Sequence, residues 1–172
     1  MSDLPPKLPP VSAIIVGINK YMSPTLSRLS HAVDDAKAVS TFLRDELNVP
    51  ETNITELYDE KATKDAILEA ISSLPSKETF RPSNALLFFF SGWAGMAPLQ
   101  EANRPTTSIG MICPVDINVN NDMGQVQTGI SDSTLVGLFD QISRTHGNNI
   151  VSKIFLYNFL LKHFDFLHRR FF

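Results

Sequence analysis

Two short apolar runs, residues 12–17 (SAIIVG) and 85–90 (ALLFFF), constrain the fold of this chain more than any other feature. Neither run alternates polar with apolar side chains, so each must be buried on both faces, as in a mostly parallel sheet that is covered by helices. A third, shorter strand is predicted over residues 54–58 (ITELY). The chain is therefore expected to form an α/β domain in which the most apolar strand, 85–90, lies near the centre of the sheet.

Three helices are predicted between and after these strands, because apolar residues recur there at the spacing of one helical face. Each helix is bounded by residues that start or stop helices: Asp34 and Pro50 for the first, Thr63 and Pro75 for the second, and Ser131 or Asp132 and Gly147 for the third. A fourth strand is expected to begin in residues 148–150. This order of strands and helices is typical of right-handed βαβ units.

The bulk properties favour one globular domain. A chain of 172 residues suffices for a single domain that buries roughly 70% of its unfolded surface. The net charge of -3 gives no reason to expect a nucleic-acid partner, and the single cysteine, Cys113, excludes an internal disulfide and favours a reducing compartment. The proline-rich leader 1–11 is expected to be disordered, and it lacks the pattern of a secretory signal. We expect a cytoplasmic or nuclear protein, without a membrane-spanning helix.

The segment after the central strand is the candidate functional loop. Residues 91–95 (SGWAG) follow the apolar run and are small apart from Trp93, so they are predicted to form a loop at the edge of the sheet. Residues 97–129 are rich in Pro, Asn, Thr and Gly, and they are interpreted as a long excursion with one small strand near residues 111–113.

The segment 151–172 differs in composition from the rest. It carries four basic residues against one acidic residue, a net charge of +3, which leaves -6 for the remainder of the chain. Three interpretations stay open: a buried terminal strand or helix that covers the sheet, a segment that was never selected to fold here, and an amphipathic segment at a membrane surface, which the absence of a single polar face does not favour. Codons for residues 151–153 can also contain a splice-donor-like GTAAGT, so read-through of an intron is a further hypothesis.

The order of these pieces resembles a known family. The stretch from AIIVGINKY to AISSL, together with NALLFFFSGWAG, MICPVD, ISDSTLVGLFDQI and HGNNI, resembles caspase-like cysteine peptidase domains of the metacaspase-related type common in fungi. The resemblance covers residues 12–150. It implies a three-layer α/β sandwich with a mostly parallel sheet, incomplete at the C-terminus, and proteolysis by a Cys-His pair of the kind linked to programmed cell death.

The catalytic pair of the family is not matched in this chain. The resemblance places the catalytic histidine after Ser91 and Gly92, where this chain has Trp93, and it places the catalytic cysteine after HGNNI, where residues 151–161 read VSKIFLYNFLL. The site is therefore expected to be catalytically inactive, with Trp93 either filling the emptied pocket or binding a peptide. Two alternatives remain: a pseudo-peptidase that acts as a dimerisation or regulatory module for an active homologue, and a hydrolase that uses Cys113 with a displaced histidine.

The other candidate residues have ordinary structural interpretations. Cys113 is expected to be a small core residue, His31 to cap a helix or lie on the surface, and His146 to lie at a helix end. His163 and His168 are five residues apart, a spacing that does not align two ligands on one helical face. The remaining pair, Asp34 and Asp35, matches an acidic position of the family and suits the start of a helix. Neither a metal nor a cofactor is expected. The partners considered are a caspase-like homologue, a second copy of the chain and, if the chain is active, a peptide substrate.

Overall fold

The computed structural model describes residues 10–82, 84–99, 107–120 and 123–157. Within them the strands are β1 (Val11–Gly17), β2 (Ile54–Tyr58), β3 (Ala85–Leu99), β4 (Thr107–Ile112), β5 (Ile130–Ser131) and β6 (Ile150–Tyr157). The helices are α1 (Ala32–Asp45), α2 (Lys64–Ser72) and α3 (Asp132–His146), and three single 3₁₀ turns cover Glu51–Asn53, Asp59–Lys61 and Leu74–Ser76. The predicted α/β order is confirmed.

The sheet is parallel in its main part and antiparallel at one end. Strand β1 pairs in parallel with β2 and β3, and β6 pairs in parallel with the other edge of β3, from Leu86 opposite Ile150 to Trp93 opposite Tyr157. The second half of β3, from Ala94 onward, pairs antiparallel with β4, which pairs in turn with β5. Strand β3 is therefore the central strand, as its apolar sequence predicts.

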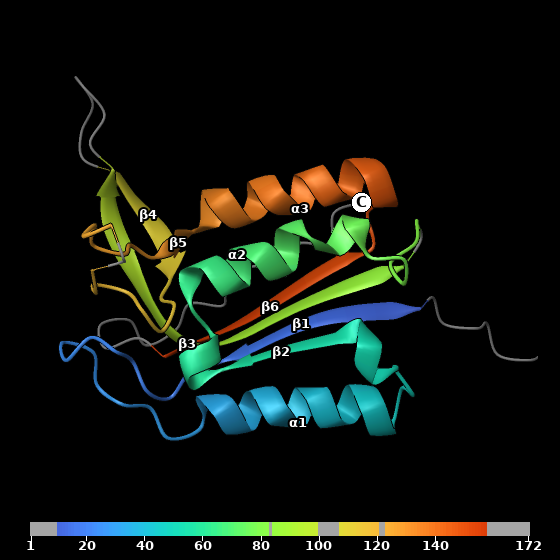
Figure 1. The fold of residues 1–172 in the computed structure, drawn as a ribbon, viewed down its shortest axis with the longest axis horizontal. Helices are drawn as coiled ribbons and strands as arrows, with labels where there is room; N and C mark the ends of the chain where they lie inside the picture. Colours follow the sequence, from blue (N-terminus) through green and yellow to red (C-terminus); the bar gives the residue numbers. More distant parts are fainter. Residues whose placement is uncertain (1–9, 83, 100–106, 121–122, 158–172) are drawn as a thin grey trace, which may run out of the picture.

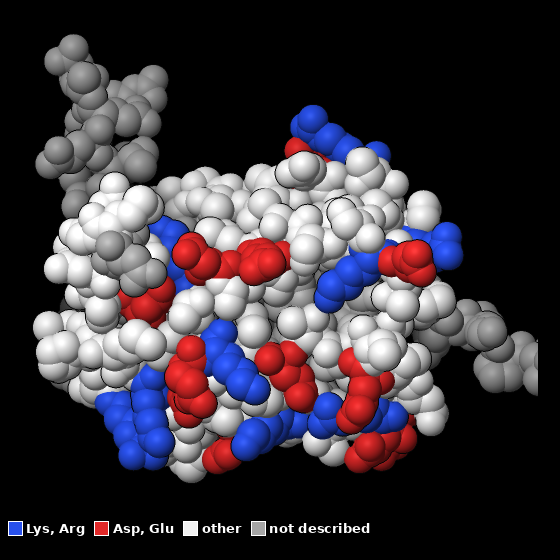
Figure 2. Space-filling view, viewed as in Figure 1, with Lys and Arg blue, Asp and Glu red and all other residues white. Residues whose placement is uncertain are grey.

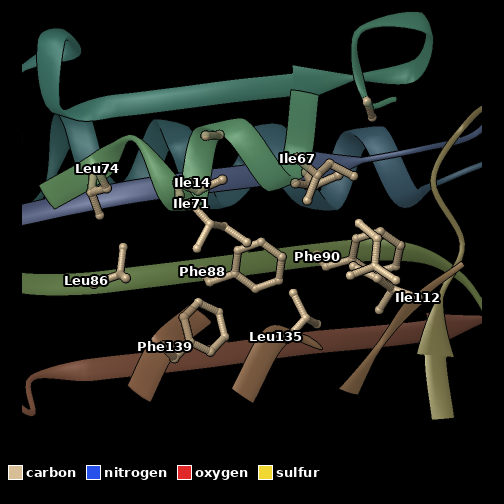
Figure 3. Close-up of a cluster of buried hydrophobic side chains, with 14 of the residues drawn as sticks. Ile14, Ile67, Ile71, Leu74, Leu86, Phe88, Phe90, Ile112, Leu135 and Phe139 are labelled. Carbon is tan, nitrogen blue, oxygen red and sulfur yellow. The ribbon is translucent and has the colours of Figure 1, made fainter. Parts of the chain in front are cut away.

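Helices cover the two faces of the sheet, which makes three layers. Helix α1 lies on one face, and α2 and α3 lie on the other (Figure 1). The α2–α3 face holds the larger apolar cluster, in which Phe88 and Phe90 of β3 meet Ile67 and Ile71 of α2 and Phe139 of α3 (Figure 3). The α1 face holds a smaller cluster that includes Ile15 and Phe89. Side chains of each strand point alternately to the two faces of the sheet, so the central strands contribute residues to both clusters.

The predicted helix boundaries follow from local chemistry. The Thr63 hydroxyl accepts a hydrogen bond from the Ala66 backbone N–H at 3.2 Å, and the Ser131 hydroxyl accepts one from Thr134 N–H at 3.1 Å. These bonds satisfy N–H groups that a helix leaves free in its first turn. Gly147 ends α3 with φ +94°, a conformation that favours glycine. The choice between Ser131 and Asp132 as the cap of the third helix is settled in favour of Ser131.

Polar contacts fix α1 against the edge strand β2. One carboxylate oxygen of Glu56 accepts hydrogen bonds from Ser40 Oγ, from Tyr58 Oη at 2.9 Å and from Arg44 Nη1 at 3.0 Å. Partial burial raises the pKa of Glu56, but the three donors outweigh it, so the pKa lies below its ordinary value. On the face drawn in Figure 2, acidic and basic side chains are interspersed rather than gathered by sign.

The fourth strand expected to begin in residues 148–150 is confirmed as β6, which runs from Ile150 to Tyr157. Two other predictions about element boundaries are wrong. Residues 91–95 are not a loop, because their backbone pairs with β6 up to Trp93 and with β4 from Ala94 onward. Val11, assigned to the leader, is the first residue of β1. In each case pairing with a distant strand extends the element beyond its apolar sequence signal.

Two further expectations concern the small strand in the excursion and the two ends of the chain. The small strand of the excursion is β4, which ends at Ile112, one residue before Cys113. Residues 1–9 of the leader and 158–172 of the tail lie outside the described residues. Of the described helices, none is long and apolar enough to span a membrane.

Candidate functional site

The candidate site lies where neighbouring parallel strands reach the same edge of the sheet. Strand β1 ends at Gly17, opposite Ser91 of β3, and β6 ends at Tyr157, opposite Trp93. The carboxyl edge of a parallel sheet is the usual place for ligand-binding groups in open α/β folds. Residues 91–93 therefore stand on a rigid strand at the edge where a site of this fold class is built.

Ser91 is held between the sheet and α1. Its side chain is buried, and its Oγ donates a hydrogen bond to Asp35 Oδ2 at 3.4 Å. Its carbonyl accepts the backbone N–H of Ile18 at 3.0 Å. Asp34 and Asp35 both lie in the first turn of α1, as expected, where their charge favours the helix dipole. Asp35 therefore has two roles, because its carboxylate lies at the start of α1 and also accepts the hydrogen bond from Ser91.

Trp93 is fixed by three hydrogen bonds. Its backbone N–H donates to Tyr21 Oη at 2.7 Å, and its carbonyl accepts the N–H of Cys113 at 3.0 Å. The indole Nε1–H donates to the carbonyl of Ser27 at 2.7 Å. The only polar hydrogen of the indole is therefore used to hold the segment 18–31 against β3.

The Tyr21 hydroxyl lies close to the backbone of Gly92 and Trp93. Burial raises the pKa of Tyr21 well above its ordinary value, although the hydrogen bond from Trp93 N–H lowers it in part, so the hydroxyl stays protonated at neutral pH. A Cβ added to Gly92 would lie 2.7 Å from Tyr21 Oη and 2.9 Å from Cζ of Phe90, so any other residue here would force one of these side chains to move. The fit of Tyr21 over Gly92 explains why this strand position has no side chain.

The segment 18–31 is held by polar side chains from elsewhere in the chain. Asp59 Oδ1 accepts the backbone N–H groups of Asn19 at 2.7 Å and Lys20 at 2.9 Å, and Asn19 Oδ1 accepts Val33 N–H at 3.2 Å. Sequence reasoning missed Tyr21, Asn19 and Asp59 as site residues. The only local signals were that Asn19 and Tyr21 follow a strand end and that Asp59 follows another.

Cys113 lies beside the site, but its thiol is not poised for reaction. The residue is 5% exposed, and burial raises the pKa of its thiol to about 11. The interactions of the two described histidines are with other residues: His31 lies beside Asp34, and His146 lies beside Phe80 and Thr145. A buried thiol with a raised pKa is a poor nucleophile. The prediction that Cys113 is a small core residue is confirmed.

The two described histidines lie elsewhere. His31 is on the surface at the start of α1, 4.0 Å from Asp34 through Nδ1, and its side chain makes no cap bond, so the surface alternative holds. His146 lies in the last turn of α3, where its ring stacks on Phe80 at 4.9 Å. His163 and His168 fall outside the described residues. Among the residues described, no group of three His, Cys, Asp or Glu side chains could hold a metal ion.

A separate hollow of about 280 Å³ opens between β4, α2 and the start of α3. Its walls include Lys64, Met111, Thr128 and Thr134, and neither Trp93 nor Cys113 lines it. Lys64 Nζ donates to Thr128 Oγ1 at 2.8 Å across it. Lys64 is the only ionisable residue in the lining of the hollow, so this lining has no acid–base pair that would serve hydrolysis.

The raised pKa of Cys113 predicts a slow thiol reaction. At pH 8 the folded chain is expected to react with DTNB about a hundredfold more slowly than the chain unfolded in guanidinium chloride, because a rise from 9.0 to about 11 leaves about one hundredth of the thiolate. The folded state also loses stability as the pH rises from about 9 toward 11. Because Cys113 is the sole thiol, the absorbance change reports it alone. Equal rates in both states would contradict this account of the thiol.

Comparisons with known proteins agree with the resemblance seen in the sequence. The family model described as metacaspase, peptidase C14 domain, matches residues 12–141. A curated relative, Metacaspase-1A of Aspergillus oryzae, is 28% identical over 110 residues, which is 60% of this chain and 25% of the relative. The chain thus spans about a quarter of the length of that protein.

A solved structure supports the fold. The crystal structure of protein GSU0716 from Geobacter sulfurreducens superposes with a TM-score of 0.62 at 16% sequence identity. The match covers 87% of this chain and 50% of that one. At this identity the likeness establishes the shared α/β architecture alone.

Proposed function

Because the chain belongs to the metacaspase family of C14 peptidase domains, we propose that it is a caspase-type cysteine endopeptidase domain by descent that does not hydrolyse peptide bonds. The observation that carries this proposal is the state of Trp93. The resemblance places it at the family position of the catalytic histidine, and its indole N–H is already donated to the Ser27 carbonyl.

The chemistry of acyl transfer supports the proposal. A peptidase of this kind needs a base that takes the proton of the nucleophile and later returns it to the leaving amine. Imidazole can do both near neutral pH, whereas indole has one donor and no accessible basic nitrogen. A site with Trp93 in this position lacks the imidazole base that the family carries at the edge of β3.

The position and sequence of the neighbouring strand, β6, also support the proposal that the domain is inactive. The register sets Tyr157 of β6 opposite Trp93, so the family nucleophile would follow β6 at the same edge. Residues 151–161 contain no cysteine. The sole thiol, Cys113, is buried and has a pKa raised to about 11, which argues against the alternative of an active hydrolase built on this residue.

A second candidate function is that of a pseudo-peptidase that regulates an active homologue. It is favoured by the contrast between a well-ordered interior and a site where the resemblance places Trp93 at the histidine position. No buried side-chain nitrogen or oxygen among the described residues lacks a hydrogen-bond partner. Co-purification of the full chain with a complete homologue from cells that express both would support this role. A chain that elutes alone at all ratios would argue against it.

Restoring the base alone is not expected to restore activity. The Trp93→His variant should cleave fluorogenic peptides with basic or acidic P1 residues no faster than buffer, because a base without a nucleophile performs no acyl transfer. Turnover is measured over micromolar to millimolar substrate, and a thiol-directed activity probe is applied in parallel. Stoichiometric labelling that the Cys113→Ser change abolishes would instead revive the third alternative, a hydrolase that uses Cys113.

A further inference from the structure

The hollow between β4 and the starts of α2 and α3 has an apolar wall on its sheet side (Figure 1). Ala97 of β3 pairs opposite Ile109 of β4, and Met111 stands two residues beyond Ile109, so the three side chains share one face of the sheet. All three line the hollow. The small side chain of Ala97 leaves space on this face that a larger residue would fill.

The side chain of Met111 packs over Gly129. A Cβ added to Gly129 would overlap the Met111 sulfur and would lie 2.9 Å from the carbonyl oxygen of Ile112. Any side chain at this position would therefore force Met111 to move. The absence of a side chain at Gly129 gives Met111 its place on the apolar wall.

The opposite wall is polar and carries one charge. Lys64, the first residue of α2, donates from Nζ to Thr128 Oγ1 at 2.8 Å, and the hydroxyl oxygens of Ser131 and Thr134 lie 2.8 Å apart. An ammonium group has three hydrogens, so Lys64 can bind an acceptor in the hollow while it keeps its bond to Thr128. Among the described residues that line the hollow, none is acidic.

The neighbouring acidic side chains serve other groups. Asp132 Oδ2 lies 3.9 Å from a Cβ placed at Gly110, which alternates with the two lining residues of β4 and therefore faces the opposite side of the strand. Asp116 Oδ1 accepts the backbone N–H of Lys64 at 2.9 Å. Neither carboxylate lines the hollow, so the Lys64 ammonium is available there to an anion from outside the chain.

We propose that this hollow binds the carboxylate of a short aliphatic acid, with the carboxylate on Lys64 and the aliphatic chain along Ile109 and Met111. A volume of about 280 Å³ lies below the roughly 300–1,000 Å³ of sites for drug-sized ligands, so a nucleotide is too large to be enclosed. Inorganic phosphate is not favoured, because one charged donor beside an apolar wall leaves most of its oxygens without partners. The chemistry required is present in a free short-chain acid and in the C-terminal residue of a peptide that ends in an aliphatic side chain.

Titration of the full chain with hexanoate tests the site through the methyl group of Met111. In NMR spectra of the chain with isotope-labelled methionine methyl groups, the Met111 signal is assigned with a Met111→Leu variant. It should shift saturably with a dissociation constant in the millimolar range, as expected for a ligand of this size. Hexanamide, the neutral isostere, and acetate, which lacks the chain, should bind about tenfold more weakly or less. A Met111 signal that does not shift up to about 50 mM hexanoate overturns the proposal, as does equal binding of hexanamide.

Two variants test the two walls separately. Lys64→Gln removes the charge and should weaken hexanoate binding about tenfold. Lys61→Gln removes the same charge from an exposed position outside the lining, so this matched control should bind like the unmodified chain. Ala97→Leu fills the hollow and should abolish binding. The remaining methionine signals show that each variant is folded, and unchanged binding by a folded Lys64→Gln or Ala97→Leu variant overturns the proposal.

A peptide ligand distinguishes the two sources of the carboxylate. An acetylated dipeptide that ends in leucine carries the same chemical group at a peptide C-terminus. If it binds more tightly than hexanoate, the hollow is a site for a peptide C-terminus, and the reverse order identifies a site for a free acid; both results support the carboxylate chemistry. The proposal does not depend on whether the domain hydrolyses peptide bonds, because neither Trp93 nor Cys113 lines the hollow.

Discussion

Replacing Phe88 by alanine is expected to lower the free energy of unfolding by about 3–5 kcal/mol. The side chain is 0% exposed on the central strand, and its ring meets Phe139 of α3 at 5.5 Å between centroids. Its removal takes apolar area out of the larger core and leaves a cavity that two helices and a sheet cannot close without moving. Guanidinium chloride denaturation followed by far-UV circular dichroism measures the change.

Phe42→Ala is the matched control for this experiment. Phe42 is 53% exposed on α1, and alanine favours a helix, so the same deletion should change stability by about 0.5 kcal/mol or less. Similar losses for the two variants would show that the core is not organised around β3 as described. A variant of Phe88 that is unfolded in buffer would agree with the expected direction, given that domains of this size are stable by only about 5–15 kcal/mol.

Gly92→Ala should cost about 1–3 kcal/mol and loosen the site. The added methyl group would lie 2.7 Å from Tyr21 Oη and 2.9 Å from Cζ of Phe90, so Tyr21 must move and the hydrogen bond that it accepts from Trp93 N–H is lost. The release of Trp93 should shift its fluorescence to longer wavelength, because Trp93 is the sole tryptophan and becomes more exposed to water.

Gly137→Ala makes the same chemical change in open space. No heavy atom lies within 4 Å of a Cβ added at Gly137, which is exposed in the middle of α3. Alanine there should raise stability by about 0.5–1 kcal/mol, because glycine is a poor helix residue. Opposite signs for the two glycine changes are expected in thermal and denaturant unfolding. Equal effects would mean that Tyr21 does not constrain Gly92.

Local sequence signals predicted most of the architecture. The caps Thr63 and Ser131 and the terminating Gly147 act within one helical turn, so they can be recognised without knowledge of the fold. The apolar runs 12–17 and 85–90 require burial on both faces, which only a covered parallel sheet provides. Strand β2 was likewise predicted with its observed bounds, Ile54–Tyr58.

The errors arose where distant pairing decides the structure. Residues 91–95 carry small side chains typical of a loop, yet β4 and β6 supply hydrogen bonds to their backbone and extend the strand. Strand β6 begins where a fourth strand was predicted, but how far it continues past the compositional change at residue 151 depends on its pairing with β3. Local composition does not predict which other strand will pair with a given segment.

The site was predicted only in part for the same reason. The resemblance points to Ser91, Gly92 and Trp93, and it places Trp93 where the family has a histidine. The partners of Trp93 could not be predicted, because Tyr21, Ser27 and Cys113 are separated from it along the chain and meet it only in the folded protein. A tryptophan in sequence does not reveal which carbonyl will receive its N–H.

The position of β6 has a consequence for how the domain is made. Synthesis proceeds from the N-terminus, so β1, β2 and β3 leave the ribosome well before residues 150–157. Until then one edge of β3, with Phe88, Phe89 and Phe90, lacks the parallel neighbour that it has in the finished sheet. During translation one edge of β3, the most apolar strand, is therefore unpaired until β6 has been synthesised. A chaperone that binds exposed strand edges is expected to protect the chain most during this interval.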